Sequence, residues 1–172
     1  MSDFIFFEQY NRMKRFLERI KTQNRNQIEY EDDIWAFFQN AWHLKDWIQN
    51  DDAFKTKNNI NIDNFLKNGI EQSTNLQICR DIANQTKHLR LKPENESRKK
   101  ISTKNITKEI NKDIELRLGG PVSDNLNVYV KYNYRFKSID GIELNVLDLA
   151  NNIVTEWGRI IDRLGPILKQ ET

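Results

Sequence analysis

The sequence predicts a mainly α-helical protein, a bundle of about four long helices with a small antiparallel β-sheet inserted before the C-terminal helix. Two observations carry this prediction. Several segments repeat apolar residues at helical spacing, whereas one segment alternates apolar and polar residues with a period of two. We find no internal repeat or heptad array that would indicate a solenoid or a coiled coil. The expected long helices cover residues 4–20, 31–50, 74–91 and 146–164.

The first two helices are amphipathic in different ways. In residues 4–20 the apolar positions form one stripe and the opposite face is basic. A polar loop follows, and Asp32 or Asp33 is expected to cap the next helix. The apolar residues of 31–50 cover about half of the helix circumference, which predicts a central helix. Residues 61–70 are consistent with a short helix.

The second half of the chain contains the expected sheet. A helix over 74–91 is expected to end before Pro93. Residues 93–105 are expected to form an exposed loop, and 106–144 a β insertion with a tight turn at Asp140-Gly141. Asn145 is expected to cap a last helix over 145–165, which Gly165-Pro166 ends. The whole of 1–172 is predicted to be a single domain.

Composition narrows the classes of function. The chain has 27 basic and 25 acidic residues, a balance that does not indicate a protein coating nucleic acid. The lone Cys79 excludes an internal disulfide, and its apolar register predicts a buried, reduced thiol. Only four consecutive apolar residues precede Glu8, too few for a signal-peptide core or a membrane span. These features predict a cytoplasmic protein without membrane contact.

One stretch, "CRDIANQTKHLRL", concentrates polar chemistry on a single helix face. On a helical projection, five polar residues fall within an arc of about 120°. We call this set the polar arc; it consists of Arg80, Asp81, Asn84, Lys87 and His88. A solvated surface would account for it, yet aspartate, asparagine and histidine are poorer helix formers than lysine or glutamate, which favours specific hydrogen bonds. A histidine beside cations and an amide suits phosphate chemistry.

The segment "ANQTKH" within a helical bundle resembles the HEPN superfamily. Its ribonuclease members carry an arginine, a polar residue that is often asparagine, and a histidine four to six intervening residues later. Asn84 and His88 match this pattern, but Ala83 stands in the place of the arginine. The cation would therefore come from Arg80, Lys87 or Arg90, or the chain is a non-catalytic relative. The sequence is also similar to small uncharacterised bacterial proteins built around "NAWHLKDW", "ANxxKH" and a terminal "DLAxxxxxEW" helix.

The HEPN resemblance implies metal-independent RNA cleavage, in which the ribose 2′-hydroxyl attacks the adjacent phosphorus. His88 would transfer the proton, Arg80 or Lys87 would stabilise the charge on the phosphate, and Asn84 would hold His88 or the phosphate in position. It also implies a dimer that pairs two sites, and a role in bacterial toxin or antiphage defence systems. No cofactor is implied.

The second histidine has two interpretations. His43 is expected to bond to a polar neighbour on its own helix, Asp46 or Gln39, in a structural role. Alternatively, Asp46 fixes its tautomer and His43 meets His88 across a groove of the bundle. A metal site would need a third ligand such as Asp46 or Asp81, and neither HxxxH nor HxH spacing is present, so no metal is expected.

Two classes of function therefore stay open. One is a HEPN-like ribonuclease, or an inactive relative, acting on RNA. The other is a non-enzymatic α-helical interaction module, expected to be dimeric, whose polar arc binds a protein partner. Convergence of the arc residues in a cleft would favour chemistry, and a convex exposed face would favour a plain solvated surface.

Overall fold

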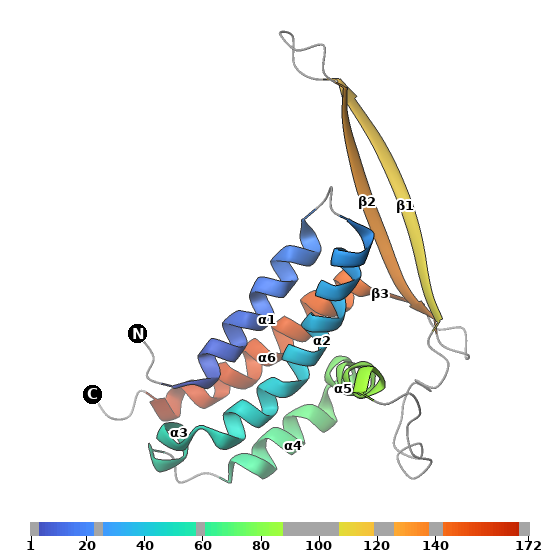
Figure 1. Cartoon of the computed structure of the whole chain (residues 1–172). Coiled ribbons are helices and arrows are strands. Elements are labelled where there is room, and N and C mark those ends of the chain that lie inside the picture. Colours follow the sequence, from blue (N-terminus) through green and yellow to red (C-terminus); the bar gives the residue numbers. More distant parts are fainter. Residues whose placement is uncertain are drawn as a thin grey trace.

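The computed structural model describes residues 4–22, 26–57, 61–87, 107–118, 126–137 and 143–168, and side chains over the narrower ranges 4–22, 26–55, 61–84, 132–136 and 143–164. These residues form six helices and a three-stranded sheet (Figure 1). The predicted class, mainly helical with a small antiparallel sheet before the last helix, is confirmed. The elements are α1 (Phe6–Lys21), α2 (Gln27–Asn50), α3 (Asp52–Lys57), α4 (Ile62–Gln72), α5 (Thr74–Lys87), β1 (Thr107–Leu118), β2 (Leu126–Lys137), β3 (Glu143–Asn145) and α6 (Val146–Leu168).

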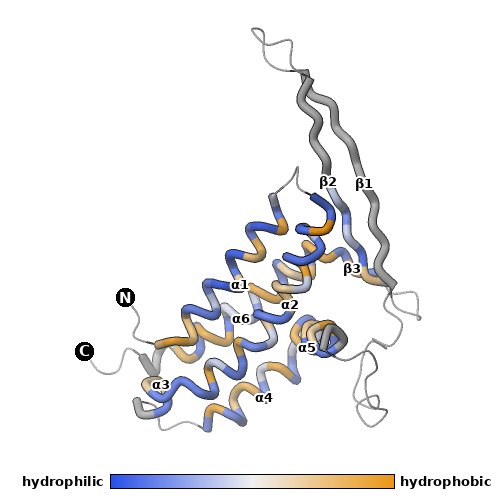
Figure 2. Tube along the Cα trace, viewed as in Figure 1, coloured by the Kyte–Doolittle hydropathy of each residue, from blue (hydrophilic) through white to orange (hydrophobic). Residues whose placement is uncertain are grey.

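The long helices α1, α2 and α6 pack along one another, and α5 contacts both α2 and α6 (Figure 1). Apolar residues gather on their inner sides, and hydrophilic residues predominate outside (Figure 2). The centre is aromatic: Phe37 and Phe38 of α2 and Trp157 of α6 are fully buried. Each such side chain contributes about 1.5–3 kcal/mol through removal of its surface from water. The broad apolar face of α2 therefore makes it the central helix, as predicted.

The start of α2 corrects the expected cap. The helix begins at Gln27, and the Asn26 side chain accepts a 2.9 Å hydrogen bond from the Ile28 N–H. Neither Asp32 nor Asp33 is the cap; Asp33 is instead buried and lies 3.3 Å from the Arg19 guanidinium of α1. The helix therefore has about one more turn at its start than the predicted helix over 31–50. This turn is stabilised because Tyr30 packs against the sheet, a tertiary contact that helix propensity does not include.

The sheet explains that packing. Its strand order is β1-β2-β3, all antiparallel, with Ile110 of β1 opposite Tyr134 of β2. The Tyr30 ring of α2 lies 5.6 Å from the Tyr132 ring and 5.5 Å from the Tyr134 ring. One turn further, Phe136 packs between Trp35 and Phe38. The near end of β2 thus covers the first half of α2, while the other end of the β1–β2 hairpin extends past the bundle (Figure 1).

A short helix that the sequence prediction missed, α3, is organised by one buried carboxylate. Asp51 accepts a hydrogen bond from the Phe54 N–H at 3.1 Å and from the Phe6 N–H at 3.2 Å. One carboxylate thus caps both α3 and the first turn of α1. Asp51 is 1% exposed, so both caps are buried.

The ends of α6 show one confirmed and one wrong prediction. The Asn145 side chain accepts hydrogen bonds from the N–H groups of Leu147 and Asp148, which is the predicted cap. At the other end, α6 continues to Leu168, so Gly165-Pro166 does not end it. Proline removes one backbone hydrogen bond but permits a last half-turn beyond it.

Several sequence predictions fall on residues 88–106 and 138–142, which lie outside the described residues. They concern the end of the 74–91 helix at Pro93, the loop over 93–105 and the turn at Asp140-Gly141. The short helix expected over 61–70 is confirmed as α4.

Candidate functional site

Helix α5, which carries the polar arc, is fixed by its N-terminus and its apolar side. Ser73 accepts a 3.2 Å hydrogen bond from the Leu76 N–H and so caps the helix. The side of α5 that shares the apolar register of Cys79 is buried, as expected for that register; its members are Leu76, Ile78, Cys79, Ile82 and Ala83. The rotation of the helix about its axis is therefore as the periodicity predicted.

The polar arc is nevertheless not solvent-exposed along its whole length. Asp81 is only 4% exposed, and its carboxylate accepts a 3.0 Å hydrogen bond from Nε of Arg80. The Arg80 side chain is 26% exposed. Solvation alone therefore does not account for this part of the arc, because a carboxylate leaves water only when its charge is compensated.

Beyond this pair the arc is described in part. Asn84 is half-buried, one turn after Arg80. Lys87 belongs to α5, but its side chain lies outside the described set, and so do His88 and Arg90 altogether. The structure thus brings Arg80 and Asp81 together with Asn84 beside them, and the predicted meeting of His88 with Asn84 or with His43 stays a prediction.

The thiol of Cys79 lies next to this pair on the inner side of α5. Its Sγ is 3.7 Å from the Phe38 carbonyl oxygen of α2. Burial, and secondarily the negative charge of Asp81, raise the pKa of the Cys79 thiol well above its usual value. The neutral thiol is therefore a packing group rather than a nucleophile, as its apolar register predicted.

His43 lies on the outer side of α2, where it is one-third exposed. Its Nδ1 is 3.1 Å from Oδ2 of Asp46, an i,i+3 pair on the same helix. This contact was expected under both interpretations of His43, so it does not decide between them. A carboxylate at Nδ1 favours the tautomer with its proton there and leaves Nε2 as an acceptor.

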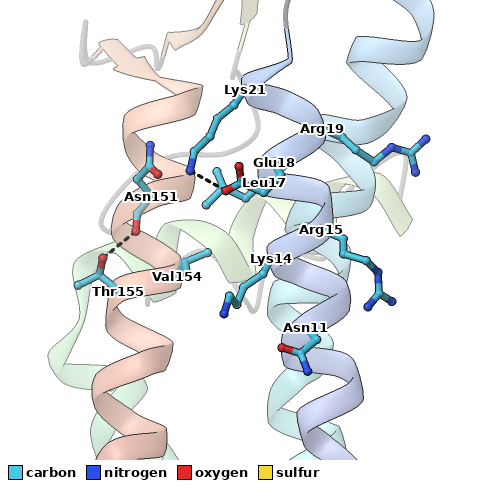
Figure 3. A pocket seen from close by; sticks show the side chains of 10 residues that line it. All are labelled: Asn11, Lys14, Arg15, Leu17, Glu18, Arg19, Lys21, Asn151, Val154 and Thr155. Carbon is cyan, nitrogen blue, oxygen red and sulfur yellow. Dashed lines mark hydrogen bonds and ion pairs between the residues drawn. The ribbon is translucent and has the colours of Figure 1, made fainter.

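A second candidate site, a groove between two helices, was not predicted from the sequence. A groove of about 700 Å³ runs between α1 and α6 (Figure 3). Leu17 and Val154 face each other at its floor, and Lys14 and Lys21 reach into it from α1 (Figure 3). The remaining lining residues are polar or charged: Asn11, Arg15, Glu18, Arg19, Asn151 and Thr155. We call this feature the α1–α6 groove.

The cations of the groove differ in how far they are neutralised. Lys21 pairs with Glu18 at 2.8 Å, and Arg19 pairs with Asp33 at 3.3 Å. Lys14 lies over the Tyr10 ring, 5.3 Å from its centroid. Among the described residues, neither Lys14 nor Arg15 has a carboxylate within ion-pair distance. The lining therefore carries a net positive charge.

The signal for this groove was present in the sequence but incomplete. The basic face of residues 4–20 and the polar residues Asn151 and Thr155 of the last helix were each visible. What the sequence does not contain is the packing of α1 against α6, which places these two faces on either side of one groove.

Other classes of site find no support among the residues described. No cluster of three or more histidine, cysteine, aspartate or glutamate side chains is placed there to hold a metal ion. Within the same residues, no helix is both long and apolar enough to span a bilayer. Comparison of the chain with protein-family models, with curated proteins and with solved structures gives no match.

Proposed function

We propose that this protein is a HEPN-like, metal-independent ribonuclease whose site is the polar arc of α5. One observation carries the proposal: the buried Asp81 carboxylate holds the Arg80 guanidinium through Nε. The two terminal nitrogens of Arg80 form no hydrogen bond to another described residue. An arginine fixed in this way presents two parallel N–H donors, the arrangement that suits a phosphate.

This geometry addresses the departure of the chain from the HEPN pattern. Ala83 occupies the position of the motif arginine, and it is fully buried on the apolar side of α5. Arg80 is one turn earlier, on the polar side with Asn84. In our proposal Arg80 supplies the missing cation and Asp81 positions it.

The proposed reaction needs only groups of this chain. His88 takes the proton of the ribose 2′-hydroxyl, whose oxygen attacks the adjacent phosphorus. The bond from phosphorus to the 5′-oxygen breaks, and that oxygen takes up a proton from solvent while the protonated His88 releases one, giving a 2′,3′-cyclic phosphate and a 5′-hydroxyl end. Arg80, with Lys87 as the alternative, stabilises the charge on the phosphate oxygens, and Asn84 orients the histidine or the phosphate.

The test is cleavage of labelled single-stranded RNA in the presence of a chelator. His88→Ala and Arg80→Ala are expected to abolish cleavage, whereas His88→Ala leaves the thermal midpoint nearly unchanged because it removes little packing. His43→Ala serves as the matched histidine control and retains activity. Absence of cleavage by the wild-type chain, or unfolding caused by His88→Ala, would refute the proposal.

The second candidate, a helical interaction module, is favoured by a different observation. The α1–α6 groove combines an apolar floor with an excess of cations, of which Lys14 and Arg15 have no acidic partner among the described residues. None of its ten lining residues belongs to the polar arc. Binding of a protein partner there requires no chemistry on α5.

A further inference from the structure

We propose that the α1–α6 groove binds an acidic amphipathic helix of a partner protein. This inference goes beyond the ribonuclease proposal and does not depend on it, because the groove and the polar arc share no residue. It specifies the partner of the interaction module by its chemistry.

Charge defines the first requirement on the partner. Four of the ten lining residues are cationic and only Glu18 is acidic. Asp33 neutralises Arg19, whereas the Lys21–Glu18 pair is exposed and therefore weak, so Lys21 stays accessible to a partner. Lys14 and Arg15 have no acidic counterpart among the described residues. Like-charge juxtaposition disfavours a basic partner, and complementary potential speeds the encounter with an acidic one.

The floor defines the second requirement. Leu17 is 5% exposed and Val154 is half-buried, so the narrow apolar strip that the groove offers to a partner is formed mainly by Val154. A partner gains binding energy here by placing an apolar side chain on that strip. Polar groups on both sides, Asn151 and Thr155 on α6 and the lysines on α1, then meet the flanks of the partner (Figure 3).

These features favour a peptide over a nucleic acid. Single-stranded RNA bound in a groove relies on aromatic side chains against which its bases stack, and none of the ten lining residues is aromatic. An amphipathic helix instead places apolar residues at i, i+3 or i+4 and i+7 into such a groove.

The length of the groove sets the length of the partner. From Asn11 to Lys21 α1 rises by about 15 Å, or nearly three turns. Lys14 and Lys21 are two turns apart on one face, about 10.5 Å along the axis. A partner helix of about three turns, with acidic residues about two turns apart beside its apolar stripe, matches both lysines.

A displayed library of helical peptides of about 16 residues, with a fixed apolar stripe and random flanking positions, provides the test. It is selected on the full chain, and the binders are measured by fluorescence anisotropy on wild type and on the Lys14→Glu/Lys21→Glu variant. The matched control is Lys67→Glu, which reverses an exposed lysine on α4, away from the groove.

The expected result is enrichment of aspartate and glutamate at the flanks, with binding weakened at least about tenfold by the double variant and unchanged by Lys67→Glu. A Val154→Ala variant that remains folded by circular dichroism should bind the same peptides more weakly. The inference is overturned if no peptide is enriched, if the enriched flanks are not acidic, or if binding is indifferent to Lys14 and Lys21. It is also overturned if an oligouridylate binds with the same dependence on Lys14 and Lys21 while no acidic peptide does. These outcomes are independent of RNA cleavage, so the ribonuclease proposal stands or fails separately.

Discussion

The Tyr134 hydroxyl of β2 donates a 2.8 Å hydrogen bond to the Glu31 carboxylate of α2, and so connects residues that are 103 positions apart. The same two elements are in contact through the rings of Tyr30 and Tyr134. Because the hydroxyl is anchored, the inserted sheet has one fixed position on the first half of α2. A two-stranded hairpin has little stability without such a contact.

We therefore expect Tyr134→Phe to lower the free energy of unfolding by about 1–2 kcal/mol, since it removes one hydrogen bond to a charged acceptor and little volume. Urea denaturation followed by far-UV circular dichroism measures the change. Tyr132→Phe is the matched control, because Tyr132 has no hydrogen bond within the described structure and should change the midpoint much less. Equal effects of the two substitutions would show that the hydrogen bond to Glu31 contributes nothing specific.

Stability should decline in alkaline solution. Burial and the hydrogen bond to Glu31 raise the pKa of Tyr134, burial and the charge of Asp162 raise the pKa of Tyr10, and burial raises the pKa of the Cys79 thiol. In the unfolded chain these groups lose their protons near pH 9 to 10, whereas the folded chain still holds them. The folded state then binds more protons, so the free energy of unfolding falls as the pH rises through this range.

Thermal midpoints recorded from pH 8 to pH 11 test this expectation. The decline should be shallower in Tyr134→Phe and in Cys79→Ala than in the wild type, because each variant lacks one of the responsible groups. A flat profile, or a slope that neither substitution alters, would contradict the assignment.

What could be predicted from sequence was the part governed by periodicity. Leu76, Cys79 and Ala83 are buried as their spacing required, and Asn145 caps α6 as its position before an apolar run indicated. The first turn of α2 was missed because its stability comes from Tyr30 packing on β2, a contact between distant segments. Helix propensity depends only on residues that are close in sequence and therefore does not predict such contacts.

The buried carboxylate of Asp51 illustrates the same limit and leads to a third prediction. It satisfies N–H groups in both α1 and α3, so Asp51→Ala should cost about 2–3 kcal/mol, more than the usual loss of a single cap. Asp52→Ala, a change at the exposed neighbouring residue, is the control and is expected to lower the free energy of unfolding by only a few tenths of a kcal/mol. A small effect of Asp51→Ala in urea denaturation would mean that water replaces the carboxylate at both helix ends.

A fourth prediction concerns thiol chemistry. Cys79 is fully buried and its thiol is neutral at physiological pH, so a thiol reagent should label the folded protein far more slowly than the protein in denaturant. Reaction with a chromogenic disulfide, with and without urea, measures the ratio. Fast labelling of the native protein would mean that α5 opens locally, or that its rotation differs from the one described.

The candidate site was predictable only as a list of residues. Helical spacing placed Arg80, Asp81 and Asn84 on one face of the helix. Spacing cannot show whether that face is exposed to solvent or buried, because its burial depends on which other elements pack over it. The structure shows that Asp81 is covered. The α1–α6 groove could not be found in this way, since its two sides come from helices at opposite ends of the chain.

The last prediction separates the Arg80–Asp81 pair from an ordinary surface ion pair. Both that pair and Arg12–Glu8 have a nitrogen–oxygen distance of 3.0 Å, yet the Asp81 side chain is 6% exposed and the Glu8 side chain is 62% exposed. Water screens the exposed pair almost completely, whereas the buried carboxylate loses a compensating donor when Arg80 is removed. Double-mutant cycles with alanine at both positions of each pair should therefore give a coupling energy of about 1–2 kcal/mol for Arg80–Asp81 and a few tenths of a kcal/mol for Arg12–Glu8.

The two single substitutions are also expected to differ. Because Asp81 takes part in a further interaction besides its bond to Arg80, Asp81→Ala should lower the free energy of unfolding more than Arg80→Ala does. If the two cycles give the same small coupling, Asp81 does not hold Arg80 in place, and the phosphate-binding role proposed for Arg80 loses its structural support.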